Sequence, residues 1–384
     1  MKKALEASGH QGFVAYGKGK HKDTGTYRIG SDAEYYFHNL MARITGLQGY
    51  FSFFATKRLI RYIKYISPDI IHLRNLHANY LNLPQLFGFL RETNIPVVLN
   101  LHDCWVFTGK CTHYTYIQCF KWKTECFKCP IKRSYPQSLF FDRTRKLYND
   151  KKIWFSGIKD LTIVGVSKWT AVQAEMSFLA NRRILTIYNW IDRGVFYPRK
   201  ENVLSTYGVD TSKFTILGVS ASWTPNSPRY EDFMKISSLI QDDMQIVLVG
   251  QSNISKFPEN IKHIPFNSDT NELAKLYSSA DVYVHLSIED TFGKVVAEAM
   301  ACGTPVVVYN STSLPELIGD GCGYVVESRD VEGVLTALNK IMTNGKNHYS
   351  GICELNVANN FDYEKNTEKL LSLYKKLLNG KNRQ

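Results

Sequence analysis

The clearest hydrophobic pattern lies between residues 281 and 309. Residues 281–286 alternate β-branched and aromatic side chains with other types, and residues 304–309 form a nearly continuous apolar run, so both are predicted to be strands. Between them, apolar side chains recur at helical spacing at Val295, Val296, Ala299 and Met300. Cys302-Gly303 before Pro305 ends that helix. The stretch therefore predicts one strand–helix–strand unit with two buried parallel strands.

Similar short apolar runs alternate with helical patterns along most of the chain. Strands are predicted at 13–16, 69–73, 97–101, 161–166, 184–188, 214–219, 245–250, 261–265 and 324–326. Helical patterns cover 32–66, 271–279, 330–343 and 363–379. Within the first of these, the aromatic residues Tyr50 to Phe54 are expected to be core rather than to meet a lipid surface. The alternation predicts an α/β fold with parallel sheets.

Carboxylates gather at the start of the 281–309 helix. Glu289 and Asp290 precede it, and Glu298 follows Asp290 by eight residues. A helix N-terminus offers unpaired N–H groups and a positive dipole end to a diphosphate. Carboxylates repel phosphate, so beside such a site they are suited to accept hydrogen bonds from sugar hydroxyls. A single acidic residue there would only stabilise the dipole, but the whole string favours a site for a phosphorylated sugar.

The run DVYVHLSIEDTFGKVVAEAMACGTPVVV resembles the glutamate-x7-glutamate motif of the family-4 retaining glycosyltransferases. The resemblance implies the GT-B architecture, an α/β fold of two Rossmann-like domains that face each other across a cleft. It implies that Glu298 holds the nucleotide ribose, that Asp290 binds donor-sugar hydroxyls, and that the backbone after Phe292-Gly293 binds sugar or phosphate. Asp290 is one methylene shorter than the usual Glu, and Lys294 replaces a usually apolar residue.

Two strand-end histidines provide a second group of candidates. His77 and His102 each follow a predicted strand, where ligands of open α/β sheets bind, although a hydrogen-bonded structural histidine is equally common there. The surrounding IIHLRNLHANYLN and IPVVLNLHDCWVFTGKC resemble a bacterial surface-polysaccharide branch of the same family, which implies that His102 faces the donor sugar. Of the family's diphosphate clamp only Arg229 is present, so either the phosphate site is weaker or Lys294 supplies the missing charge.

The resemblance also implies a domain plan. Residues 1–190 form the acceptor-side domain, 191–205 a linker, 206–362 the nucleotide-sugar domain, and 363–384 a final helix that packs back on the first domain. At the junction YNWIDRGVFYP, Trp190 stands where the family has Gly, so the turn must either differ from the family's or not require a positive φ.

The N-terminus departs from the family pattern. No first strand and glycine loop precede the first helix, so the expectation is a start called too late or a shortened chain. Such a chain is expected to bind nucleotide but transfer sugar poorly, because the missing loop would position the substrate.

Composition agrees with a protein that handles anions. The formal net charge is +12, no apolar run approaches transmembrane length, and MKKALEASGH lacks a signal-peptide core, so a soluble globular protein is expected. A Cys-rich insert at residues 104–135 opens the most basic stretch, residues 110–146, which carries nine Lys or Arg against Glu125 and Asp142. We call residues 104–146 the basic insert. Such a stretch suits an acceptor near anionic lipid, or RNA. The strand–helix organisation argues against nucleic acid.

Five of the eight cysteines fall between residues 104 and 129. Four of them, Cys111, Cys119, Cys126 and Cys129, make a set compatible with a closed structural zinc site. Reduced cysteines are the equal alternative, and a redox CxxC or a cytosolic disulfide is disfavoured.

Together these features predict a metal-independent retaining glycosyltransferase. It would move a sugar from a UDP- or GDP-sugar to a bacterial polysaccharide or lipid-linked glycan, in the cytoplasm or at the inner face of the plasma membrane. The diphosphate would be stabilised by helix N–H groups and cations rather than by a metal. The alternatives are a GT-B epimerase, a glycogen-type phosphorylase, an inactive nucleotide-sugar-binding paralogue and an RNA-binding protein.

Overall fold

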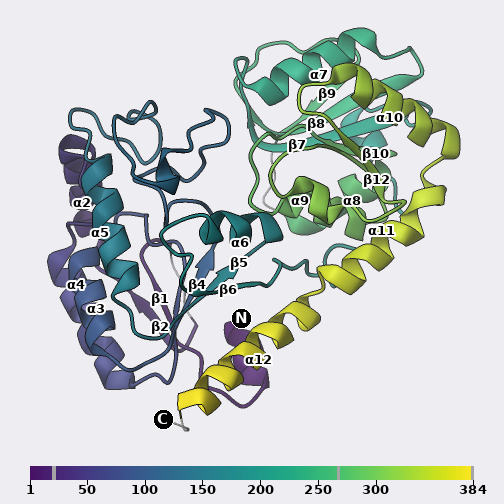
Figure 1. The fold of residues 1–384 in the computed structure, drawn as a ribbon. Coiled ribbons are helices and arrows are strands. Elements are labelled where there is room, and N and C mark those ends of the chain that lie inside the picture. Colours follow the sequence, from purple (N-terminus) through teal and green to yellow (C-terminus); the bar gives the residue numbers. More distant parts are fainter. Residues whose placement is uncertain (20–22, 266–268, 382–384) are drawn as a thin grey trace. The chain divides into compact units, whose positions relative to one another are not determined.

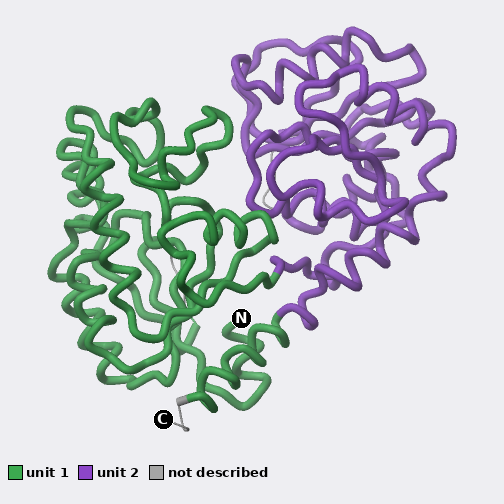
Figure 2. Tube along the Cα trace, in the orientation of Figure 1, with its two compact units in different colours: residues 1–187, 367–384 green, residues 188–366 purple. Residues whose placement is uncertain are grey.

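The chain folds into two compact units. The computed structural model describes residues 1–19, 23–265 and 269–381. Residues 1–187 together with 367–384 form unit 1, and residues 188–366 form unit 2 (Figure 2). The structure therefore divides the chain after Ile187, and a C-terminal segment returns to the first unit.

A four-stranded parallel sheet organises unit 1. Its strands lie in chain order: β3 (Ile71–Leu73), β4 (Val97–Leu101), β5 (Leu161–Gly165) and β6 (Arg183–Thr186). All five residues of β4 and of β5 are buried, as the apolar runs predict for central parallel strands. The predicted 13–16 strand is β1 (Val14–Tyr16), which pairs with β2 (Thr26–Arg28) in a separate parallel sheet.

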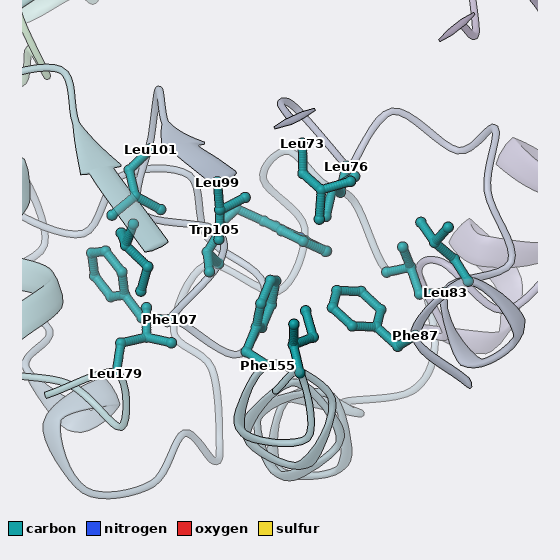
Figure 3. Close-up of a cluster of buried hydrophobic side chains, with 14 of the residues drawn as sticks. Leu73, Leu76, Leu83, Phe87, Leu99, Leu101, Trp105, Phe107, Phe155 and Leu179 are labelled. Carbon is teal, nitrogen blue, oxygen red and sulfur yellow. The ribbon is translucent and has the colours of Figure 1, made fainter. Parts of the chain in front are cut away.

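Each face of the main sheet in unit 1 is covered by a different set of helices. Leu99 and Leu101 point into a core shared with Phe87 of α4 (Leu83–Glu92) and Phe155 of α5 (Thr144–Ser156) (Figure 3). On the other face, Val98 and Val164 meet apolar residues of α12 (Tyr363–Lys381): Leu370, Leu373, Tyr374 and Leu377. Alternation along β4 explains why neighbouring residues join different cores.

The helical pattern over residues 32–66 corresponds to two helices. It is divided into α2 (Asp32–Thr45) and α3 (Phe53–Ile66), because Gly46 caps α2 at φ 73° and Ser52 also lies in the left-handed region. The expectation that Tyr50 to Phe54 are core is wrong for Phe53 and Phe54, whose side chains are 52% and 69% exposed. The remaining helices of unit 1 are α1 (Lys2–Ala7) and α6 (Lys168–Glu175).

Unit 2 contains a six-stranded parallel sheet in the order β9-β8-β7-β10-β11-β12. Its strands are β7 (Phe214–Trp223), β8 (Met244–Ser252), β9 (Ile261–Ile264), β10 (Val282–His285), β11 (Val306–Tyr309) and β12 (Gly323–Val326). This is the doubly wound strand order. The first three strands are added toward one edge of the sheet and the next three toward the other edge, so the strand order reverses between β7 and β10. Ligands of such sheets bind beyond the carboxyl ends of those two strands.

Five helices pack around this sheet. They are α7 (Pro228–Leu239), α8 (Thr270–Ser279), α9 (Lys294–Ala301), α10 (Val331–Asn344) and α11 (Asn347–Asn360) (Figure 1). The sequence pattern missed α11, which is rich in Asn and contains Gly351, both weak helix formers. Its buried residues Tyr349, Cys353 and Val357 recur every four positions, and the helix packs against α9. No helix in the described ranges is both long and apolar enough to cross a bilayer.

Candidate functional site

The candidate site of unit 2 begins where β10 ends. His285 is the last residue of β10, and both of its ring nitrogens are hydrogen-bonded. Nδ1 lies 2.9 Å from Tyr283 Oη, and Nε2 lies 2.8 Å from Asp290 Oδ2. Tyr283 and His285 are buried, whereas the side chain of Asp290 is 27% exposed. The arrangement holds one partly exposed carboxylate at the carboxyl edge of the sheet.

Backbone contacts fix the loop that carries Asp290. Its N–H donates to Thr312 Oγ1 at 3.0 Å, and Ser313 Oγ donates to its carbonyl oxygen at 2.9 Å. Burial alone would raise the pKa of Asp290, but hydrogen bonds from His285 and Ser287 and the charge of Arg229 lower that pKa below its usual range. Asp290 is therefore a fixed acceptor, ionised at neutral pH.

Arg229 lies in the first turn of α7, after the carboxyl end of β7. Its Nη1 donates to Ser220 Oγ at 3.1 Å, while its Nε is buried without a hydrogen-bond partner among the described residues. Its charge acts on both Asp290 and Tyr283. The structure thus brings Arg229 and Asp290 together at the point where the sheet reverses, as binding of a phosphorylated ligand would require.

Glu298 projects from α9 into the interior of unit 2. Its side chain is 7% exposed, and Oε1 lies 3.4 Å from Nζ of Lys294, which is 60% exposed. Burial raises the pKa of Glu298, and Lys294 opposes the rise. Burial raises the pKa of the Tyr283 hydroxyl, and the charges of Asp290 and Glu298 add to that rise.

Phe292 and Gly293 shape the start of α9. Phe292 is buried, with its ring 5.5 Å from the ring of Phe361, so its side chain belongs to the core and only its backbone can face a ligand. Gly293 caps α9 at φ 81°, and a Cβ there would lie 2.7 Å from Leu314 Cδ2. A glycine is required for both reasons.

In unit 1, His102 follows β4 and meets Arg74, which follows β3. Nε of Arg74 donates to Nε2 of His102 at 3.0 Å. Burial and the Arg74 charge lower the pKa of His102 to about 4, although Asp103 opposes them. His102 is therefore neutral at pH 7. Arg74 and His102 meet because β3 and β4 are neighbours in the sheet, and the sequence pattern did not predict this contact.

His77 and Asp103 form a second strand-end pair. Nε2 of His77 lies 2.7 Å from Asp103 Oδ2, and Nδ1 lies 3.0 Å from the hydroxyl of Tyr135. Asp103 also accepts from the N–H of Trp105 at 2.8 Å. Burial would raise the pKa of Asp103, but these bonds lower it. The pair joins β3, β4 and the basic insert, so both histidines singled out in the sequence have defined polar partners.

Sequence reasoning missed His285 and Arg74. The signal for His285 was available: a histidine at the end of a predicted strand, five residues before the motif carboxylate. Arg74 carried no local signal, because only the pairing of β3 with β4 places it beside His102.

The cysteines of the basic insert lie near one another. All are free thiols, and burial raises the pKa of Cys126 to about 12, with further contributions from Cys111 and Cys119. Burial likewise raises the pKa of Cys129 to about 11, with a contribution from Cys111. Within the part of the chain that the structure describes, no three His, Cys, Asp or Glu side chains are arranged as metal ligands.

Comparison with known proteins relates these features to a family. Residues 233–351 match the family model described as "Glycosyl transferases group 1", and this range contains β10, α9 and the pair Asp290 and Glu298. The chain is 25% identical over 273 residues to a putative colanic acid biosynthesis glycosyl transferase, WcaC, of Escherichia coli K12, which is 69% of this chain and 65% of that protein. It is 30% identical over 138 residues to the E. coli O-antigen chain mannosyltransferase B, which is 36% of this chain and 35% of that protein.

Solved structures agree on the fold. A glycosyltransferase from Rickettsia africae superposes with a TM-score of 0.66 at 18% identity, covering 98% of this chain and 93% of that one. Anabaena HepE in complex with UDP superposes with a TM-score of 0.63 at 14% identity, covering 91% of each chain. The fold is therefore that of the GT-B glycosyltransferases, with two Rossmann-like units.

Both of the E. coli relatives are named as transferases of polysaccharide biosynthesis. The matches span only 65%, 43% and 35% of the first three curated relatives.

Proposed function

We propose that this protein is a retaining glycosyltransferase that moves a sugar from a nucleotide-sugar donor to a bacterial surface polysaccharide or lipid-linked glycan. The observation that carries the proposal is the set of Arg229, Asp290 and Glu298, whose charges all act on Tyr283 of β10 at the reversal point of the unit 2 sheet. Asp290 and Glu298 lie inside the group 1 segment. Relatives named for colanic acid and O-antigen chain synthesis support the acceptor class, and a HepE structure with UDP supports the donor class.

Each residue has a distinct task in this proposal. Glu298, buried beside Lys294, accepts hydrogen bonds from the ribose hydroxyls. Asp290, held by His285, accepts hydrogen bonds from hydroxyls of the transferred sugar. Arg229, Lys294 and the first N–H groups of α9 stabilise the charge that grows on the leaving diphosphate. A well-placed donor of this kind contributes roughly 3 kcal/mol to the transition state.

The charges also favour a front-face reaction. Asp290 accepts from His285 and carries its negative charge at neutral pH, so it suits holding hydroxyls and stabilising positive charge on the sugar ring. Departure of the diphosphate on the face where the acceptor enters would retain the anomeric configuration. His102, neutral beside Arg74, is assigned to the same reaction as a contact to the donor sugar.

We place the reaction in the cytoplasm, where nucleotide-sugars are available, at the inner face of the plasma membrane. The metal-independent mechanism and the structural zinc at Cys111, Cys119, Cys126 and Cys129 remain part of the proposal. No step of the transfer uses that zinc.

The decisive experiment measures nucleotide release from UDP- and GDP-sugars, with and without a membrane extract that carries lipid-linked glycans. We expect release with one nucleotide, stimulated by the extract, and a product whose anomeric signal in NMR matches the donor. Asp290→Asn is the control and should abolish stimulation. Conversion of the free donor sugar without transfer would indicate an epimerase, and nucleotide binding without turnover would indicate a binding protein.

A further inference from the structure

Six aromatic side chains of unit 1 are exposed on three neighbouring segments. They come from α2, from the start of α3, and from the end of the basic insert: Tyr36, Phe37, Phe53, Phe54, Phe140 and Phe141. Their exposed fractions run from 50% to 69%. We refer to these six residues as the aromatic face.

Contacts join the three segments to one another through α2. The ring of Phe37 lies 6.4 Å from the ring of Phe51, which directly precedes α3, and Phe53 and Phe54 follow with their rings 5.6 Å apart. At the other end of α2, the carbonyl oxygen of Arg43 accepts from the N–H of Leu139 at 2.8 Å. The insert therefore extends the surface that α2 and α3 begin.

A basic cavity is lined in part by residues of α2 and of the basic insert. Its volume is about 310 Å³, and Phe141 of the aromatic face is part of its lining. Its cationic lining residues include Arg43, Lys132, Arg133 and Arg143. The carboxylate in the lining, Asp142, already accepts from Thr144 Oγ1 at 2.6 Å and from the N–H of Cys129 at 2.7 Å. The cavity thus carries an excess of positive charge.

Exposed aromatic rings beside clustered cations are suited to the surface of an anionic lipid bilayer. Contiguous exposed apolar surface is uncommon on proteins without a partner for it. Phe and Tyr gain free energy at the boundary between lipid headgroups and acyl chains, and Lys and Arg gain about 1 kcal/mol each near an anionic leaflet. A protein partner would explain the rings but would not require the excess of cations around them.

We propose that unit 1 docks on an anionic lipid surface through the aromatic face, and that the basic cavity receives a phosphate group borne by a lipid. This deepens the proposed function, since it says where a lipid-linked acceptor meets the protein. The binding itself does not depend on sugar transfer, so it can be tested whether or not the enzyme assay succeeds.

Flotation with vesicles tests the aromatic face. The full chain should bind vesicles of phosphatidylcholine and phosphatidylglycerol in equal parts and bind phosphatidylcholine vesicles much more weakly. The double variant Phe54→Ser/Phe140→Ser should bind the anionic vesicles about tenfold or more weakly, because two buried rings are lost. Tyr65→Ser is the matched control, since Tyr65 is 86% exposed at the opposite end of α3, and it should bind as the wild type does.

A second arm tests the cavity with inorganic pyrophosphate as competitor, at matched ionic strength. Pyrophosphate should weaken vesicle binding by the wild type and have little effect on Arg43→Gln/Arg133→Gln, whose own vesicle binding should fall severalfold. Arg61→Gln removes a charge from an exposed position of α3 outside the cavity and is the control.

The proposal is overturned if the wild type ignores vesicles, if it binds neutral and anionic vesicles equally, or if the Phe54/Phe140 variant matches Tyr65→Ser. If pyrophosphate competes equally with the wild type and the double Arg variant, the basic cavity does not bind the lipid phosphate.

Discussion

Nε2 of His285 lies 2.8 Å from Oδ2 of Asp290, and this pair fixes the carboxylate at the reversal point of the unit 2 sheet. His285 is itself held by the buried hydroxyl of Tyr283 at 2.9 Å. The chain of contacts runs from the sheet interior to a partly exposed oxygen acceptor. Asp290 therefore has the preorganisation that a substrate-contacting group requires.

Replacing Asp290 with Asn should lower kcat by about two to three orders of magnitude, the cost typical of losing one preorganised charge contact. Calorimetry should show little change in nucleotide affinity, because the nucleotide is assigned to Glu298. A loss of nucleotide binding equal to the loss of kcat would instead assign Asp290 to the nucleotide.

The same variant should show a pH-dependent stability difference. The pKa of Asp290 is lowered in the folded state, so its ionised form stabilises the fold above the unfolded-state pKa of about 4. That stabilisation is lost as pH falls through the folded-state pKa. Thermal melts should therefore show Asp290→Asn below the wild type at neutral pH, with the gap closing in acid. A gap that widened in acid would contradict the assigned sign.

Glu298→Gln should weaken nucleotide binding about tenfold, since a charge-assisted hydrogen bond to the ribose is lost. Stability should respond differently. Burial raises the pKa of Glu298, so ionising it costs free energy as pH rises through the raised pKa, and Gln avoids that cost at pH 7.

We expect an unchanged or higher Tm together with weaker binding, measured by calorimetry and thermal melts. Glu332→Gln on α10 is the control, because Glu332 is an exposed residue of a first helical turn. If nucleotide affinity of Glu298→Gln equals that of the control, the ribose assignment fails.

Gly293→Ala should destabilise unit 2 by about 1–3 kcal/mol, because alanine is strained at φ 81° and its Cβ would clash with Leu314. The matched control is Gly88→Ala in α4, where a Cβ meets nothing within 4 Å. That change should stabilise the protein by about 0.5–1 kcal/mol through helix propensity. Denaturant melts measure both. Equal effects would show that the left-handed turn before α9 is not a constraint.

Zinc at Cys111, Cys119, Cys126 and Cys129 has a test of its own. A tetrathiolate zinc centre carries a net charge of −2, and two lysines are buried beside the cysteines: Lys110 is 4% exposed and Lys151 is 1% exposed. Both donate to backbone carbonyls, Lys110 to those of Ile131, Lys132 and Ser134, and Lys151 to that of Trp105. A negative centre would balance their charge.

The described side chains are not arranged as metal ligands. Zinc binding should therefore order the four cysteines around the metal and raise the Tm of the protein. We expect about one zinc per chain in protein purified without chelator, and a lower Tm after chelation. Cys104→Ser is the control, because Cys104 lies outside the set of four. Metal content well below one per chain would leave the reduced cysteines as the correct interpretation.

The amino-acid sequence by itself determined most of the strands and the core of the site. The unit at 281–309 was predicted because periodicity, Gly293, Gly303 and Pro305 all act locally, and the structure confirms it as β10, α9 and β11. The sequence also predicted that Asp290 precedes this helix and that Glu298 lies within it, and the structure has Asp290 before α9 and Glu298 on it.

Tertiary structure decided the features that depend on distant partners. The 32–66 stretch has a helical pattern, but the left-handed residues Gly46 and Ser52 divide it into two helices, and the fold leaves Phe53 and Phe54 exposed. The composition of α11 is unfavourable for a helix, and packing against α9 stabilises it.

The pairings of Arg74 with His102 and of His77 with Asp103 arise because β3 and β4 are neighbours in the sheet. Such contacts join residues more than twenty positions apart, so no local pattern encodes them. Local periodicity specifies elements, whereas sheet order and burial specify which side chains meet and which charges remain ionised.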